Sequence, residues 1–286
     1  MKLSTIKIEG RETAAVAGPS GLVTLEQINR TEGTDWPSDL YELLRKGELD
    51  KLKVWYSNGG REKLAQMSAV PEKVAVFAPL YRHPRKIWGI GMNYVSDAAE
   101  LDSISPDEEP VGFMKPDTSI IGPGDAIRIP EGSDHTTAEA ELAIIIGKEC
   151  RHITEEEAPG YVAGITTSLD MTEAAVHARN PRFLTRAKSY DTFFSYGPQL
   201  HTLEECPDIL NTAVETVING EVRHRNVISN MRFRPWFTVA FHSRVMTLLP
   251  GDIIITGTPG PVLIRAGDQV ECRIGGFRPL INPVEG

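Results

Sequence analysis

The sequence lacks a long apolar segment. Its strongest apolar runs, residues 143–147 and 253–255, are the size of single strands, whereas a membrane-spanning helix needs roughly 18 or more consecutive apolar residues. The first residues also lack the apolar core of a secretory signal peptide. We therefore expect a soluble protein with no membrane partner.

Cysteine and positive charge are also scarce. The 286 residues include 3 cysteines, which stand far apart with no C-x-x-C pair, and this argues against a disulfide framework or a cysteine-based zinc site. Lys and Arg number 30 against 39 Asp and Glu, so the net charge is -9, and no basic run is present. These features predict a cytoplasmic protein with a small-molecule partner and no nucleic acid.

Long amphipathic helices do not alternate with strands, and the sequence contains neither G-x-G-x-x-G nor a Walker loop, which disfavours a doubly wound sheet. Short apolar runs instead follow turns of one kind, Pro-Gly-Asp at 123–125 and 250–252 and Ala-Gly-Asp at 266–268. Glycine supplies the positive φ of such turns, and aspartate bonds to its own backbone. The pattern predicts a mainly β protein with a few helices, of the α+β class.

The chain divides into two predicted parts, a smaller N-terminal α+β domain over 1–82 and a catalytic domain over 83–286. Alternating or apolar runs predict N-terminal strands at 2–8, 12–16 and 22–24. The leucine spacing after Pro37 predicts a helix that ends near Gly47, and a second helix is expected over 61–66. Further short helices are predicted over 96–101, 155–160 and 172–179.

Glu139 and Glu141 begin an apolar strand over residues 142–146. Residues two apart in a strand share a face, so these side chains project together from Cα atoms roughly 6.6 Å apart. Two carboxylates at the edge of a buried strand are costly unless a metal or a shared proton compensates. The alternative interpretation is a solvated strand end.

Three other features point to the same chemistry. Asp170 ends an apolar run over 161–169, Lys188 follows, and the turn Thr256-Gly-Thr-Pro259 follows a buried strand. Each has an alternative explanation, respectively a helix cap, a surface charge and a simple turn. With Glu139 and Glu141, these features supply three hard oxygen ligands, a cation, and a turn that can hold a carboxylate. Carboxylate ligands favour Mg²⁺ or Mn²⁺, and they also suit Ca²⁺.

The order of motifs resembles the fumarylacetoacetate hydrolase family over residues 85–284. The matching segments are Gly91-Met-Asn-Tyr94 with Glu100, Phe113-Met-Lys115-Pro, Ile121-Gly-Pro-Gly-Asp125, Glu139-Ala-Glu141-Leu-Ala, Gly164 to Asp170, Arg186-Ala-Lys188-Ser-Tyr-Asp191, Gly197-Pro198, Asn219-Gly220, and Leu249-Pro-Gly-Asp252 to Pro259.

This resemblance implies a mixed β-roll catalytic domain and a homodimer. It implies that Glu139, Glu141 and Asp170 bind the metal, with Lys188 beside it as a catalytic residue. The resemblance also implies that Tyr94, Lys115, Gly257 and Thr258 bind the substrate. His177 is expected to bind it too, because it stands at a substrate-binding position of the family.

The sequence departs from the family at two places. Family hydrolases commonly carry a histidine that pairs with a glutamate to activate water, whereas this chain has Asp97 at that place and retains Glu100. Ala174 and His177 stand where many members have an arginine and a glutamine. His135 is a further histidine near the proposed site. We expect the segment 96–109 to act as a lid.

These features predict a divalent-metal-dependent enzyme acting on a small 2-oxo acid or 1,3-diketo acid. The first expectation is hydrolytic C–C cleavage of an acylpyruvate or fumarylpyruvate through a metal-bound enolate, with Glu100, with or without Asp97, positioning water and Lys188 stabilising the enolate. The same enolate would serve an oxaloacetate decarboxylase, a keto–enol isomerase or a sugar-acid dehydratase. A relative that binds metal or ligand without catalysis is the non-enzymatic alternative.

Overall fold

The fold is that of a computed structural model, which describes residues 1–105 and 107–286 and is mainly β, as predicted. Its strands are β1 (Lys2–Ile8), β2 (Arg11–Gly18), β3 (Gly21–Thr24), β4 (Ile87–Gly91), β5 (Val111–Lys115), β6 (Ile120–Ile121), β7 (Ile127–Arg128), β8 (Thr136–Ile146), β9 (Val162–Glu173), β10 (Phe194–Tyr196), β11 (Gln199–His201), β12 (Ala213–Ile218), β13 (Glu221–Val227), β14 (Ile253–Ile255), β15 (Val262–Leu263), β16 (Gln269–Ile274) and β17 (Leu280–Glu285). The α-helices are α1 (Leu25–Glu32), α2 (Leu40–Arg45), α3 (Leu49–Trp55), α4 (Arg61–Leu64), α5 (Ala174–Arg179), α6 (Leu184–Ala187) and α7 (Pro235–Val245).

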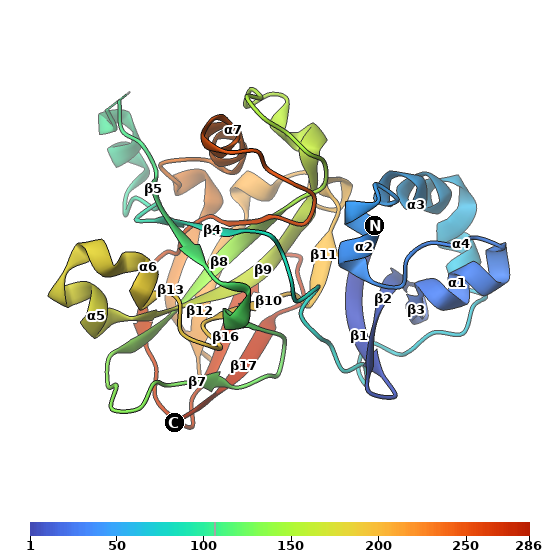
Figure 1. The fold of residues 1–286 in the computed structure, drawn as a ribbon, viewed down its shortest axis with the longest axis horizontal. Coiled ribbons are helices and arrows are strands. Elements are labelled where there is room, and N and C mark those ends of the chain that lie inside the picture. Colours follow the sequence, from blue (N-terminus) through green and yellow to red (C-terminus); the bar gives the residue numbers. More distant parts are fainter. Residues whose placement is uncertain (106) are drawn as a thin grey trace.

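Two sheets organise the described residues. The larger follows the order β3-β2-β1-β11-β9-β8-β14-β4-β5, with β6, β10 and β15 paired at its sides, and the smaller follows β13-β12-β16-β17-β7. The long strands β8 and β9 run antiparallel through the centre of the larger sheet, with β12 and β16 close to them (Figure 1). Residues carried by β8 and β9 are therefore placed by a rigid, buried ladder.

The N-terminal part is joined to this larger sheet. Strand β1 pairs antiparallel with β11, so β1–β3 extend the sheet, while α1–α4 lie around them on one side of the molecule (Figure 1). One apolar cluster includes Leu3, Leu40 and Leu52 together with Phe194 and Ile253. Independent folding of residues 1–82 stays a prediction.

The predicted N-terminal helices are present as α2 and α4, and Asp39 caps α2 by accepting from the Glu42 backbone N–H at 2.8 Å. Helices α1, α3, α6 and α7 were not predicted. Helix α1 does carry end signals, because Thr24 caps its start and Gly33 ends it at φ 69°. Helix α7 carries no clear apolar stripe, because its buried face includes the polar Thr238, His242 and Ser243, whereas aromatic rings on its other side stay partly exposed.

The other predicted helices are shorter than expected or shifted. The segment 172–179 becomes helical only at Ala174, because Thr172 and Glu173 still belong to β9. Short 3₁₀ helices occupy Ala98–Ser103 and Ala158–Tyr161. None of the described helices is long and apolar enough to cross a membrane.

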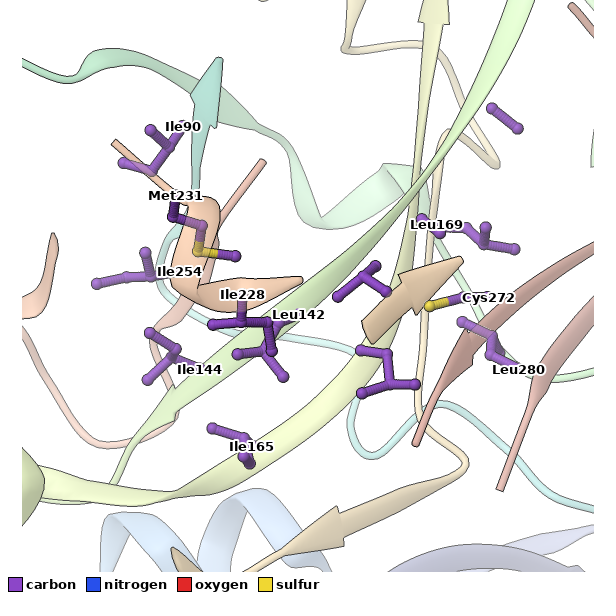
Figure 2. Packing of buried hydrophobic residues seen from close by; sticks show 14 of the residues in the cluster. Ile90, Leu142, Ile144, Ile165, Leu169, Ile228, Met231, Ile254, Cys272 and Leu280 are labelled. Atoms are coloured by element: carbon purple, nitrogen blue, oxygen red, sulfur yellow. The ribbon is translucent and has the colours of Figure 1, made fainter. Parts of the chain in front are cut away.

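The two faces of β8 meet different apolar cores. Leu142 and Ile144 belong to the cluster that also contains Ile228, Met231 and Ile254, and Figure 2 shows these side chains gathered on one side of the strand. The alternate residues Ala143 and Ile145 belong to the second cluster. Because the strand is buried on both faces, its register cannot slip without moving apolar side chains into the wrong core.

We expect acid to destabilise the protein through His201, which stacks on Phe277 with ring centroids 4.1 Å apart. Burial, and then the charge of Lys2, lower the pKa of His201 from 6.5 to about 4. Between these two pH values, His201 is protonated in the unfolded chain but neutral in the folded protein. The contribution of His201 to stability is therefore complete above about pH 6.5 and is lost as the pH falls toward about 4.

Urea unfolding at about pH 7 and about pH 5 measures this effect. His201→Gln should lose less stability between the two values than the unsubstituted protein does. The exposed His83 provides the control, because His83→Gln should follow the unsubstituted protein. An unchanged pH dependence in His201→Gln would contradict the prediction.

Candidate metal centre and active-site cavity

The register between β8 and β9 brings three carboxylates together. Glu139 lies directly opposite Asp170 in the ladder, and Glu141 lies two residues further along the same face of β8. One carboxylate oxygen from each of the three residues lies within 4.8 Å of the others. The spacing that suggested a shared site in the sequence therefore corresponds to one compact cluster.

Two lysines compensate the charge of this cluster. Lys188 forms ion pairs with Asp170 and, at 3.0 Å, with Glu139. Lys115 forms a second ion pair with Asp170 at 2.6 Å, and both of these side chains are fully buried. Burial by itself lowers the pKa of Lys188, but Asp170, Glu139 and Glu141 raise it above its ordinary value, so the ammonium stays charged.

Glu141 is held from the other side by the turn after β14. The backbone N–H of Gly257 donates to Glu141 Oε2 at 2.6 Å. Burial, and then the charge of Asp170, raise the pKa of Glu141 well above its ordinary value. A side chain at Gly257 would approach Asn93 Cβ to 2.8 Å, and Gly257 has φ 93°, so glycine is required for this approach.

A cavity of about 910 Å³ opens at the triad. Glu139 and Lys188 lie in its wall, and the Lys188 ammonium sits 4.8 Å from the centre of the Phe113 ring. Tyr94 also lines the cavity; its Oη is buried and has no hydrogen-bond partner among the described residues. Burial, and then Glu141, raise the pKa of Tyr94, so its hydroxyl remains a proton donor that a ligand could satisfy.

Comparison with known proteins shows the family of this chain. The family described as "Fumarylacetoacetate (FAA) hydrolase C-terminal" matches residues 86–285. This chain belongs to the fumarylacetoacetate hydrolase family. The resemblance predicted from its motifs is thereby confirmed, and the site lies inside the matched region.

Three relatives illustrate the chemistry found in the family. "Oxaloacetate tautomerase Fahd2a, mitochondrial" of Rattus norvegicus is 31% identical over 256 residues, which covers 87% of this chain and 80% of the relative. The solved structure of a fumarylacetoacetate hydrolase from Exiguobacterium antarcticum has TM-score 0.84 at 27% identity, with 100% and 99% of the two chains covered. Maleylpyruvate hydrolase from Sphingobium sp. SYK-6, solved with manganese (II) ion and pyruvate, has TM-score 0.80 at 26% identity over 100% and 99%.

In this family member, several predicted site residues meet at the cavity. Tyr94, His177 and Thr258 line it together with Glu139 and Lys188. They come from the segment after β4, from α5 and from the turn after β14, which are far apart in sequence. Their roles toward metal and substrate stay proposals. His135 is not among the lining residues.

Two predicted substrate-binding residues contact the triad carboxylates and are not among the residues that line the cavity. Lys115 has no exposed side-chain surface and donates to Asp170 and, at 3.2 and 2.5 Å, to the carbonyl oxygens of Met171 and Lys188. The backbone N–H of Gly257 donates its hydrogen bond to Glu141. Both residues therefore contact carboxylates of the triad and are not among the lining residues of the cavity, and their role in substrate binding stays a prediction.

The proposed water-activating residues do not join the triad in this structure. Asp97 caps a 3₁₀ turn by accepting from the Ala99 N–H at 3.0 Å, and Glu100 accepts from the Asp97 N–H at 2.9 Å. Both are exposed and absent from the cavity wall. Pro106, within the predicted lid, lies outside the described residues, and lid closure stays a prediction.

Sequence reasoning missed much of the cavity wall. Glu108 and Glu109, Phe113, Arg232 and Phe233 line it, although none was predicted as a site residue. Phe113 stood in a recognised motif, which was a usable signal. Arg232 and Phe233 lie more than 40 residues after Lys188 and about 25 residues before Thr258. Their place in the cavity wall is therefore visible only in the folded chain.

Proposed function

We propose that this protein is a divalent-metal-dependent enzyme that interconverts the keto and enol forms of an oxaloacetate-like 2-oxo acid. The observation that carries the proposal is the composition of the cavity. It gathers the groups that would stabilise an enolate, whereas Asp97 and Glu100, the candidates for activating water, cap an exposed turn. The relative named oxaloacetate tautomerase, 31% identical, supports the same reaction.

Glu139, Glu141 and Asp170 would hold the metal. Their oxygen atoms suit Mg²⁺ or Mn²⁺, and three nearby carboxylates with two of them buried form a donor set that a divalent cation compensates. When bound, the cation would act as a Lewis acid that favours loss of a proton next to the 2-oxo group. The relative solved with manganese and pyruvate supports this choice of ion and ligand class.

The chain's own residues would orient the substrate and move the proton. Lys188 and the Tyr94 hydroxyl would donate hydrogen bonds to oxygen atoms that gain negative charge. Tautomerisation moves one proton between the carbon next to the 2-oxo group and the oxygen of that group. His177 is the cavity residue of the type that exchanges protons near neutral pH, and we assign that transfer to it.

The proposal predicts metal-dependent tautomerisation. Purified protein with Mg²⁺ or Mn²⁺ should accelerate the conversion of enol-oxaloacetate to the keto form, which is followed by the ultraviolet absorbance of the enol. A chelator should abolish the acceleration, and added metal should restore it. Glu100→Gln should retain the rate, because Glu100 lies off the cavity. A rate equal to that in buffer would overturn the proposal.

Hydrolysis of an acylpyruvate is the second candidate. The similarity to maleylpyruvate hydrolase over 99% of that chain favours it. Coupling released pyruvate to lactate dehydrogenase would detect cleavage. In that case Asp97→His, which places a base with a pKa near neutral beside Glu100, should keep or raise the hydrolytic rate.

A further inference from the structure

Arg232 is a cation of the cavity that the proposed reaction leaves unassigned. Among the described residues in the cavity wall, the permanently charged cations are Lys188 and Arg232. Lys188 forms ion pairs with Asp170 and Glu139. Arg232 instead pairs with Glu108, from Nη1 to the two carboxylate oxygens at 3.1 and 3.4 Å. The two cations therefore line one cavity but pair with different carboxylates.

The backbone of Arg232 is fixed relative to the triad. Its N–H donates to the carbonyl oxygen of Asn93 at 2.7 Å, and Asn93 is fully buried. The Asn93 side-chain amide donates in turn to the carbonyl oxygen of Thr256 at 2.7 Å, next to Gly257, which holds Glu141. A short chain of hydrogen bonds thus joins the backbone of Arg232 to the metal-site loop.

The side-chain end of Arg232 is less firmly held. Side-chain exposure is 29% for Arg232 and 37% for Glu108, and an ion pair at this exposure contributes little to stability. Within the described part of the chain, Nε and Nη2 make no hydrogen bond. A guanidinium is a planar fork that matches a carboxylate, so Glu108 occupies a place that a ligand carboxylate could take over.

We infer that Arg232 binds the second carboxylate of the substrate, so that the enzyme selects 2-oxo dicarboxylates over 2-oxo monocarboxylates. The inference rests on the proposed function, which places the 2-oxo acid group at the triad. Glu108 holds the guanidinium in place until the substrate's carboxylate replaces it. Recognition is therefore divided between the triad at one end of the ligand and Arg232 at the other.

Binding of oxaloacetate and of its 4-methyl ester tests this inference, because the ester lacks the second negative charge and otherwise adds only a methyl group. Titration calorimetry with Mg²⁺ present should show tighter binding of oxaloacetate. Arg232→Gln should reduce that preference about 10- to 100-fold, the usual effect of losing a charged hydrogen bond. In turnover, the loss should appear mainly in KM.

Arg234→Gln is the matched control, because Arg234 is an exposed arginine two residues away that does not line this cavity. It should keep the preference of the unsubstituted protein. Glu108→Gln should strengthen oxaloacetate binding, because it removes the competing carboxylate. An unchanged preference in Arg232→Gln, or an equal loss in Arg234→Gln, would overturn the inference.

The experiment separates the inference from the proposed reaction. If oxaloacetate is tautomerised but Arg232→Gln keeps the full preference, the reaction stands and the inference fails. If oxaloacetate binds through Arg232 without being tautomerised, the inference stands and the proposed reaction fails. If neither molecule binds in the presence of metal, both are wrong.

Discussion

Replacing Glu141 with glutamine should weaken binding of Mg²⁺ or Mn²⁺ by more than about 100-fold and remove activity with it. Substitutions of groups that only support metal ligands cost about 10- to 100-fold, and Glu141 is a proposed ligand itself. The substitution keeps the size of the side chain, so the buried Gly257 contact at 2.6 Å can persist. Calorimetric titration of metal into the purified variant measures the affinity.

The same variant should be no less stable than the unsubstituted protein when metal is absent. Burial and Asp170 raise the pKa of Glu141, which means that its charge is unfavourable in the metal-free fold. Thermal unfolding with a chelator should therefore show an equal or higher Tm for Glu141→Gln, whereas metal should raise the Tm of the unsubstituted protein alone. Unaltered metal affinity in the variant would exclude Glu141 as a ligand.

Replacing Lys115 with methionine should destabilise the metal-free protein by about 3–5 kcal/mol, the usual cost of removing one partner from a buried ion pair. Lys115 and Asp170 are fully buried and lie 2.6 Å apart. The carbonyl oxygens of Met171 and Lys188 would also lose a donor. Urea unfolding with a chelator present measures the difference.

Two comparisons make this result specific. Lys63→Met removes an exposed ion pair with Glu32 and should change stability little. Lys188→Met removes the ammonium at the cavity wall and should lower kcat about 10²- to 10³-fold, as expected for a group that stabilises developing charge. If Lys115→Met keeps its stability and raises KM alone, Lys115 binds substrate directly and does not act through Asp170.

Local sequence patterns predicted the elements that are defined by neighbouring residues. The strand Lys2–Ile8 was predicted with its observed bounds, because alternation with a period of two is visible in the sequence alone. Helix α2 followed from three leucines at helical spacing and a terminal glycine. Helix α7 was missed because its buried face carries the polar residues Thr238, His242 and Ser243, so no apolar stripe marks the helix in the sequence.

The convergence of the three carboxylates was predictable for a different reason. Glu139 and Glu141 share a face because of strand geometry, and two acids ahead of an apolar run are unfavourable without compensation. Asp170 could be added because it ends a second apolar run. The family resemblance then supplied their expected common role, which the spacing itself could not.

By itself, the sequence determined the mainly β fold, the family and the three acids, because these depend on periodicity, composition and residue order. Only the tertiary structure decided which residues face the cavity. The Lys115–Asp170 pair joins residues 55 apart, and the pair Arg232–Glu108 joins residues 124 apart. Such contacts depend on strand register and on the path of the chain between sheets, so a residue's chemical type does not reveal its partner. Glu100 is a different case, because it accepts from the Asp97 N–H three residues earlier, a capping-box spacing that the sequence itself contains.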